Sequence, residues 1–279
     1  MSKAPAAESV PQAATACCQS ESHGVVGNHG YENKGEDVLL TKGNLQMYVV
    51  KPGDWNGGNA ILVLHDVFGP DSGRTKQICD EWAAKGYLVA MPVLWKDNLP
   101  ESYDEGPMIL KLFKLIPMIS WLRKNRWKRI GPLLTDHAIP WMVEQGATVI
   151  ALACFCFGFY PMVYLLAENK QGVLAGGVGL HPSLQVFSAM HESSKPLLDK
   201  IDKPLMMLSS GGDPGDIKPG GRCDKAFRPK ACYEKCVFKL YPDMIHGWVN
   251  RGDLGNEKIK RDYDDSRMVS GAFLESLFL

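Results

Sequence analysis

Apolar and polar positions divide the chain into short continuous apolar runs and longer segments with helical spacing. The run 59–65, Asn-Ala-Ile-Leu-Val-Leu-His, has the continuous apolar character of a strand that is buried on both faces of a parallel sheet. The segment 72–85 instead places its apolar residues at the spacing of an amphipathic helix, and Gly86 follows its last residue. The pattern therefore predicts strands that alternate with helices.

The other predicted elements continue this alternation along the chain. Strands are predicted at 36–41, 45–50, 87–91, 147–153, 173–179, 204–209 and 236–240. Helices are predicted at 158–168 and 264–277, and residues 105–145 are predicted to form a helical cap or insertion that is interrupted near Pro117 and Pro132. This order indicates an α/β fold with a mostly parallel, doubly wound sheet and flanking helices.

The domain organisation follows from a change of composition near the start of the chain. Residues 1–33 are rich in Ala, Ser, Gln, Gly and Asn with little periodicity, which predicts a loosely ordered N-terminal arm. The regular pattern then continues to the last residue without a linker between two cores. We therefore expect residues 34–279 to form a single domain.

Composition and charge limit the classes of partner and the cellular location that we expect for the protein. Hydrophobic residues make up 45% of the chain, and 31 Lys and Arg balance 31 Asp and Glu, so no basic excess favours a nucleic acid or an anionic membrane as partner. The chain start has no apolar signal region, and no run approaches the roughly 18 apolar residues of a membrane span. We expect a cytoplasmic protein with free thiols, and the sequence does not indicate its oligomeric state.

The eight cysteines include one pair, Cys232 and Cys236, with C-x3-C spacing. A zinc site of the finger type needs a second pair of ligands at suitable spacing, and the chain does not provide one. We therefore expect scattered structural or exposed thiols rather than a metal site.

Three clusters along the chain carry candidate chemistry. Cys156 ends an apolar strand at a turn of small residues, Asp213 follows the next-to-last predicted strand, and His246 follows the last. A nucleophile, an acid and a histidine in this order, each after a strand, match the triad of α/β-hydrolases, with cysteine in place of serine. Asp66 also follows a strand, and ligands of open parallel sheets bind at the carboxyl ends of strands. Cys156, Asp213 and His246 are therefore the predicted catalytic residues.

The predicted roles leave two alternatives open. Cys156 would be the nucleophile, because Gly158 provides the small neighbour that a tight turn needs and a helix N-terminus stabilises a thiolate. Cys154 is a competing nucleophile that fits the turn less well. His246 would act as the base, and Asp213 would orient it, although Asp216 lies in the same loop and is a rival for that role.

The turn 66–69, Asp-Val-Phe-Gly, is the candidate oxyanion-binding loop. In this arrangement one N–H comes from a loop after an early strand, here Val67, and the other from the residue after the nucleophile, here Phe157. If Asp66 points inward, it is also a candidate acid that gates the protonation of Cys156; otherwise it is an ordinary turn residue.

Taken together, these segments resemble the dienelactone hydrolase family (carboxymethylenebutenolidase-like) in its eukaryotic form. The resemblance rests on Cys17-Cys18 and on the segments 31–36, 66–69, 83–87, 156–158, 181–183, 212–214, 218–221 and 246–248. It implies a Cys-His-Asp triad on an α/β-hydrolase fold that hydrolyses a small lactone or activated ester through a thioester, without metal or cofactor. It also implies a thiol-gating acid at Asp66, which is one methylene shorter than the glutamate of the bacterial enzymes.

Two departures from the family pattern motivate an alternative hypothesis. The family turn usually reads Gly-x-Cys-x-Gly-Gly, whereas this chain has Cys154 at the first position and Phe159 at the last. A hydrolase-fold protein that binds a ligand or regulates, with weak or no turnover, is therefore the second hypothesis. A thiol redox protein that uses Cys154 and Cys156 is a third, although C-x-C spacing is short for a relaxed disulfide.

Overall fold

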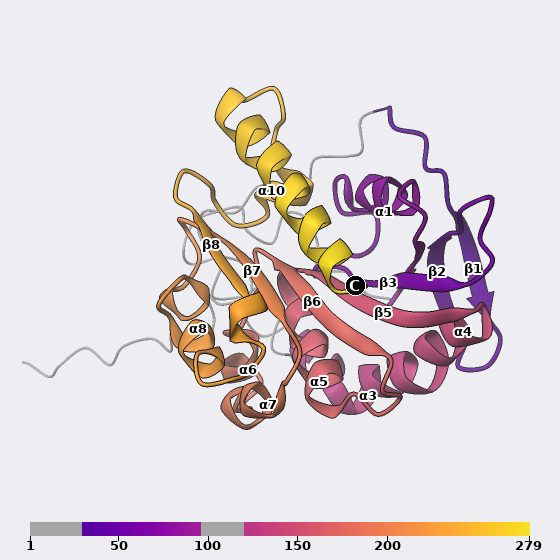
Figure 1. Cartoon of the computed structure of the whole chain (residues 1–279), viewed down its shortest axis with the longest axis horizontal. Coiled ribbons are helices and arrows are strands. Elements are labelled where there is room, and N and C mark those ends of the chain that lie inside the picture. Colours follow the sequence, from indigo (N-terminus) through magenta and orange to yellow (C-terminus); the bar gives the residue numbers. More distant parts are fainter. Residues whose placement is uncertain (1–29, 96–119) are drawn as a thin grey trace, which may run out of the picture.

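A computed structural model describes residues 30–95 and 120–279 of the chain. Within them one eight-stranded sheet forms the centre of the molecule (Figure 1). The strands are β1 (Glu36–Leu40), β2 (Leu45–Val50), β3 (Gly58–Leu64), β4 (Leu88–Pro92), β5 (Ala147–Phe155), β6 (Leu174–Leu180), β7 (Leu205–Ser210) and β8 (Val237–Tyr241).

The strand order is β1-β2-β4-β3-β5-β6-β7-β8. β1 and β2 form an antiparallel pair at one edge, β2 is antiparallel to β4, and all other neighbours are parallel. The chain winds outward from β3 in both directions, which is the doubly wound arrangement that the alternating pattern predicts. Because β3 and β5 to β8 are parallel, the loops after these strands meet at one edge of the sheet.

Helices cover both faces of the sheet and bury two separate apolar cores. One face carries α1 (Thr75–Ala83), α9 (Trp248–Arg251) and α10 (Glu257–Ser276), and α1 and α10 lie side by side above the sheet in Figure 1. The helices of the other face are α3 (Trp127–Pro132), α4 (Ile139–Glu144), α5 (Phe159–Glu168), α6 (Val186–Ala189), α7 (Lys195–Lys200) and α8 (Arg222–Phe227). The sheet is therefore the middle of three layers: β4 is fully buried, and β3 is buried from Ala60 to Leu64.

The predicted fold class is confirmed, and each predicted strand is present with ends within two residues of the prediction. The predicted helix at 72–85 is shorter than expected, because its first turn is irregular and α1 begins at Thr75. The short helices α6 to α9 were not predicted, since four to six residues contain too few turns to show an apolar period.

Two helix predictions are wrong in detail. The last helix begins at Glu257, two turns before the predicted start, because its first turns are charged and its N-terminus is capped by Asn256, which accepts from the N–H of Lys258 and Ile259. The predicted interruption at Pro132 does not occur: the chain stays helical with φ −58° and continues as a π-helix over Leu133–Ala138. The wider π turn tolerates a proline, which has no N–H to donate. The prediction at Pro117 lies outside the described residues.

The beginning of the described chain packs on α1. The hydroxyl of Tyr31 and the N–H of Lys34 donate to the same oxygen of Asp80, at 3.0 and 2.9 Å, and Tyr48 donates to the other oxygen at 2.6 Å. The predicted arm lies almost wholly outside the described residues, so the division at residue 34 stays a prediction. Over 30–95 and 120–279, no helix is long and apolar enough to cross a membrane.

Candidate active site

The loop after β5 holds Cys156 in a strained backbone conformation. Cys156 is the first residue of a 3-10 turn, Cys156–Gly158, that leads directly into α5, and its φ is +50°. A non-glycine residue at such an angle costs about 1–3 kcal/mol and persists only where the surrounding structure enforces it. Gly158 is required for close packing, because a Cβ there would lie 2.2 Å from the carbonyl oxygen of Leu64 in β3. The sharp turn therefore follows from packing against the neighbouring strand.

Cys154 occupies a different environment. It lies within β5, paired with Leu64 on β3 and Gly179 on β6, and it is fully buried. Burial raises the pKa of its thiol well above the ordinary value, and the nearby Cys156 adds to the rise. Phe159, the other departure from the family pattern, is also fully buried and packs 3.5 Å from where a Cβ of Gly179 would lie. The ring of Phe159 therefore packs against the backbone of β6.

His246 and Asp213 meet between the ends of two neighbouring strands. β7 ends at Ser210 and β8 at Tyr241, so the loops that follow them lie side by side. His246 Nδ1 lies 2.6 Å from Asp213 Oδ1, and both side chains are buried. The other oxygen of Asp213 accepts the N–H of Ser210 at 2.6 Å. The rival Asp216 instead faces Arg222 at 3.1 Å on the exposed surface.

The charges around His246 favour its imidazolium form. Burial lowers the pKa of His246, but the charges of Cys156 and then Asp213, together with the hydrogen bond to Asp213, outweigh it and raise the pKa to about 10. Cys156 is therefore a close neighbour of the imidazole that Asp213 holds. The three residues predicted as a triad lie together at the carboxyl edge of the sheet.

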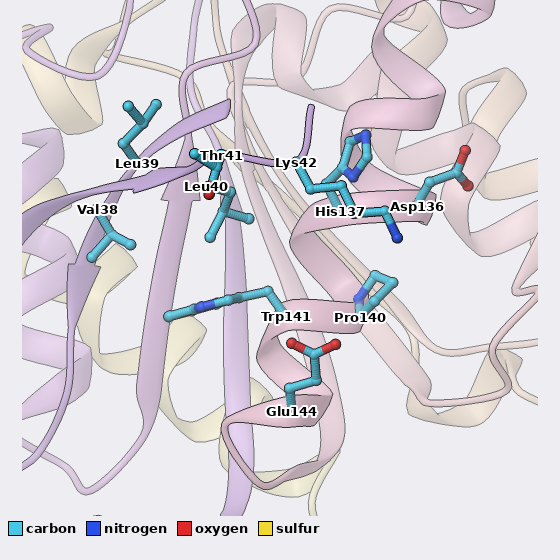
Figure 2. Close-up of a pocket in the computed structure, with 10 residues that line it drawn as sticks. All are labelled: Val38, Leu39, Leu40, Thr41, Lys42, Asp136, His137, Pro140, Trp141 and Glu144. Atoms are coloured by element: carbon cyan, nitrogen blue, oxygen red, sulfur yellow. The ribbon is translucent and has the colours of Figure 1, made fainter. Parts of the chain in front are cut away.

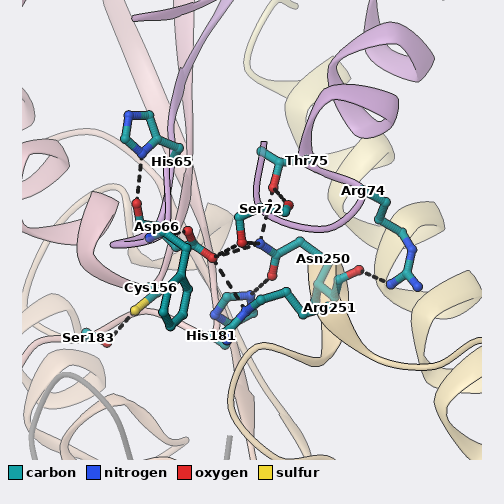
Figure 3. Close-up of polar contacts among 12 residues, drawn as sticks. His65, Asp66, Ser72, Arg74, Thr75, Cys156, His181, Ser183, Asn250 and Arg251 are labelled. Atoms are coloured by element: carbon teal, nitrogen blue, oxygen red, sulfur yellow. Dashed lines mark hydrogen bonds and ion pairs between the residues drawn. The ribbon is translucent and has the colours of Figure 1, made fainter. Parts of the chain in front are cut away.

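Ser183 contacts Cys156 in two ways, although no role was predicted for it. Its N–H donates to the carbonyl oxygen of Cys156 at 3.0 Å, and its hydroxyl lies 3.4 Å from the Cys156 sulfur (Figure 3). The first contact helps to hold the turn, and the second places a polar group beside the thiol. Its position in the run 181–183, directly after β6, is the signal that could have indicated it.

The loop after β3 is held rigidly at the same edge. Asp66 is fully buried: its Oδ1 accepts the N–H of Phe68 at 2.9 Å, and its Oδ2 accepts the Ser72 hydroxyl at 2.7 Å and the Asn250 amide at 2.9 Å. Arg251 Nε lies 3.5 Å from the same Oδ2. These contacts direct the carboxylate toward α9 (Figure 3), and the gating role stays a prediction.

Val67 follows Asp66 in this loop, and its N–H makes no hydrogen bond to a described residue. His65 supports the loop from the other side, with Nδ1 2.8 Å from the carbonyl oxygen of Asp66 and Nε2 accepting the N–H of Leu94. Burial lowers the pKa of His65 to about 4, against the raising effect of its hydrogen bond to Asp66. A neutral imidazole therefore helps to fix the backbone beside Val67.

Phe157, whose N–H is the second predicted oxyanion donor, directly follows the nucleophile candidate. Its ring packs edge-on against Trp95 and Trp121, with centroids 5.0 and 5.1 Å apart. This aromatic cluster fixes the residue beside Cys156 and makes this side of the turn apolar.

A separate shallow pocket of about 330 Å³ lies between the edge strand β1 and the helical segment that ends in α4, with His137 and Trp141 among its lining residues (Figure 2). None of the predicted site residues lines it. In the part of the chain that the structure describes, no group of three His, Cys, Asp or Glu side chains is arranged to hold a metal ion.

Comparison with known proteins identifies the family. The dienelactone hydrolase family profile matches residues 45–270. The hydrolase pyvD of Aspergillus violaceofuscus is 32% identical over 233 residues, which cover 84% of this chain and 87% of the relative. The chain belongs to the dienelactone hydrolase family. It is therefore a carboxylic ester or lactone hydrolase.

More distant relatives agree with this assignment. The hydrolase tropI of Talaromyces stipitatus is 22% identical over 237 residues, 83% of this chain and 87% of the relative. Two solved structures share the fold. Protein TT1662 of Thermus thermophilus has 16% identity and a TM-score of 0.55, and the match covers 88% of this chain and 98% of that one. A dienelactone hydrolase-like promiscuous phosphotriesterase from metagenomic libraries has 15% identity and a TM-score of 0.54, and the match covers 88% of this chain and 99% of that one. At these identities the structural likeness concerns the α/β-hydrolase fold alone.

Proposed function

We propose that this dienelactone hydrolase family member cleaves small esters or lactones through a thioester on Cys156. The observation that carries the proposal is the 2.6 Å contact between His246 and Asp213, with Cys156 as a close neighbour of the same imidazole. A nucleophile, a base and an acid that orients the base form the arrangement used for acyl transfer.

The steps follow from these positions. His246 takes the proton of the Cys156 thiol, and the sulfur attacks the substrate carbonyl carbon. The N–H groups of Val67 and Phe157 stabilise the oxyanion of the tetrahedral intermediate. His246 then donates its proton to the leaving alkoxide, the thioester remains on Cys156, and a water activated by His246 releases the acid. For a lactone, the alcohol formed on ring opening stays covalently attached to the acyl chain, and the last step releases a single hydroxy acid.

The geometry also supports an activated thiol. The strained turn presents Cys156 at the N-terminus of α5, where the helix dipole favours negative charge. An imidazolium beside the sulfur also favours negative charge there. The buried Cys154, whose pKa is well above its ordinary value, is a poor alternative nucleophile.

The experiment is a burst assay with p-nitrophenyl acetate. A thioester mechanism predicts a rapid release of p-nitrophenol close to one equivalent per chain in the wild type, and no burst in Cys156→Ala. Cys154→Ala is the matched control and should keep the burst. Full turnover in Cys156→Ala would overturn the mechanism. Absence of any burst in the wild type with slow alkylation of Cys156 would instead favour the ligand-binding alternative.

A further inference from the structure

Asn250 is the centre of a buried polar network that the proposed steps do not use (Figure 3). Its side chain lies in α9 and is fully buried. The amide nitrogen lies 2.9 Å from Asp66 Oδ2, 3.1 Å from Thr75 Oγ1 and 3.3 Å from Ser72 Oγ. The amide oxygen lies 3.1 Å from His181 Nε2. One side chain thus joins the loop after β3 to the loop after β6.

The orientation of this amide is fixed by the hydrogen atoms of its neighbours. The Ser72 hydroxyl donates to Asp66 at 2.7 Å, and the Thr75 hydroxyl donates to the Ser72 carbonyl at 2.6 Å. The carboxylate of Asp66, which faces Arg251, only accepts. All three neighbouring oxygens can therefore accept from Asn250, so its NH2 group, and not its oxygen, faces them.

The amide orientation in turn fixes the tautomer of His181. Because the oxygen of Asn250 faces Nε2, that nitrogen carries the hydrogen and Nδ1 does not. Burial lowers the pKa of His181 well below its ordinary value, and the positive charges of His246 and Arg251 lower it further, against the raising effect of the Asn250 hydrogen bond. Nδ1 is buried and has no partner among the described residues. His181 is therefore neutral.

His181 packs directly on the histidine of the proposed triad. The rings of His181 and His246 meet edge to face, with centroids 4.9 Å apart and an interplanar angle of 74°. The other ring near His181 is that of Phe155 in β5, at 6.0 Å. The charged groups that bear on it are His246 and Arg251, with Asp66 reached through Asn250. His181 thus contributes a surface to His246 but no charge.

We propose that Asn250 is a positioning residue of the hydrolytic site, which ties the oxyanion-binding loop to His181 and holds that buried ring in its Nε2–H tautomer against His246. The proposal rests on the proposed function of His246. A charged His181 at 4.9 Å would disfavour the imidazolium by on the order of a hundredfold at an effective dielectric constant of about 20. The same amide also holds Asp66, next to the N–H of Val67.

The first test is ¹⁵N NMR of the histidines in the wild-type chain, with His181 assigned through His181→Gln. The expected result is a hydrogen on Nε2 and none on Nδ1 of His181, unchanged between pH 5 and pH 9. A hydrogen on Nδ1, or a charged His181 at pH 7, would overturn the proposal. This readout needs no turnover, so it stays decisive even if Cys156→Ala proves active and the proposed function fails.

The second test is Asn250→Asp, which keeps the size of the side chain but places a carboxylate beside Asp66 and beside His181 Nε2. We expect His181 to be protonated at pH 7 and kcat for p-nitrophenyl acetate to fall about ten- to hundredfold, with KM within about threefold. The pH profile of Cys156 alkylation by iodoacetamide should shift as well. Unchanged kcat, or a loss of kcat with unchanged His181 protonation and alkylation profile, would show that Asn250 is not a positioning residue.

The matched control is Asn256→Asp, at the N-cap of α10, where aspartate accepts the same two N–H bonds. It should keep kcat within about twofold. If Asn250→Asp does not fold, as judged by circular dichroism, the histidine NMR of the wild-type chain decides instead.

Discussion

Replacing Asp213 by asparagine removes the group that orients His246 while preserving the shape of the site. Asp213 accepts two short hydrogen bonds, from His246 Nδ1 and from the N–H of Ser210, both at 2.6 Å. In Asp213→Asn the amide oxygen can still accept from Ser210, so the NH2 group faces His246. Nδ1 must then accept, which places the imidazole hydrogen on Nε2, and a ring in that tautomer cannot take the proton of the Cys156 thiol.

The expected loss of kcat follows from this change of the His246 tautomer. In a serine triad the corresponding change lowers kcat about 10⁴-fold, and we expect a loss of roughly 10³–10⁴-fold here. The loss of a buried charge-assisted hydrogen bond should also lower the free energy of unfolding by about 1.5–3 kcal/mol. Steady-state hydrolysis of p-nitrophenyl acetate gives the first quantity, and urea unfolding followed by circular dichroism gives the second.

Asp216→Asn is the matched control, because Asp216 is in the same loop but pairs with Arg222 on the surface at 3.1 Å. An exposed pair contributes about 0–1 kcal/mol, so kcat should stay within about twofold of the wild type. Turnover of Asp213→Asn within about threefold of the wild type, or equal losses in the two variants, would refute the assignment of the orienting acid.

Three further predictions concern the turn, the buried charges and the pH dependence. Gly158→Ala should lower the free energy of unfolding by at least about 1–3 kcal/mol in urea titrations, because its Cβ would lie 2.2 Å from the carbonyl oxygen of Leu64. Arg251→Met should cost about 3 kcal/mol in the same titrations, since it leaves a fully buried carboxylate without its cation. In Cys156→Ala the pKa of His246 should fall below its value of about 10, because one of the charges that raise it is gone, so the imidazolium loses its proton at lower pH. NMR titration of the imidazole Cε1 hydrogen measures this shift, and an unchanged midpoint would contradict it.

Each of these variants has a control in the chain. Gly53→Ala adds a Cβ with no atom within 4 Å and should leave stability unchanged within about 0.5 kcal/mol. Arg222→Met removes an exposed cation and should cost less than about 1 kcal/mol. Cys154→Ala should leave the titration of His246 near its wild-type midpoint. Changes in unfolding free energy or in the His246 midpoint that are as large in the controls as in the test variants would show that the structural reasons given are wrong.

The sequence was sufficient to predict the sheet, because its strands are buried on both faces and appear as continuous apolar runs. It also placed Cys156, Asp213 and His246 at one edge, since each follows a strand and parallel strands end together. It could not choose between Asp213 and Asp216, because both are turn aspartates in one loop, and only the fold directs one inward and leaves the other exposed.

The residues that support the site could not be predicted from the pattern of apolar and polar positions, for a different reason. Asn250 and Arg251 belong to a four-residue helix, and no periodicity distinguishes a buried polar residue there from an exposed one. Their partner Asp66 lies 184 residues from Asn250 along the chain. Such a contact depends on the assembled sheet, so the network around Asn250 appears only in the structure.

The measurement that tests the central claim most directly is peptide mapping by mass spectrometry after rapid acid quenching of the enzyme with p-nitrophenyl acetate. The account predicts one acetyl group per chain, carried by Cys156 as a hydroxylamine-sensitive thioester during turnover and absent from the Cys156→Ala variant. An acetyl group on another residue during turnover, or a burst of p-nitrophenol with no acylated chain at any quench time, would contradict it.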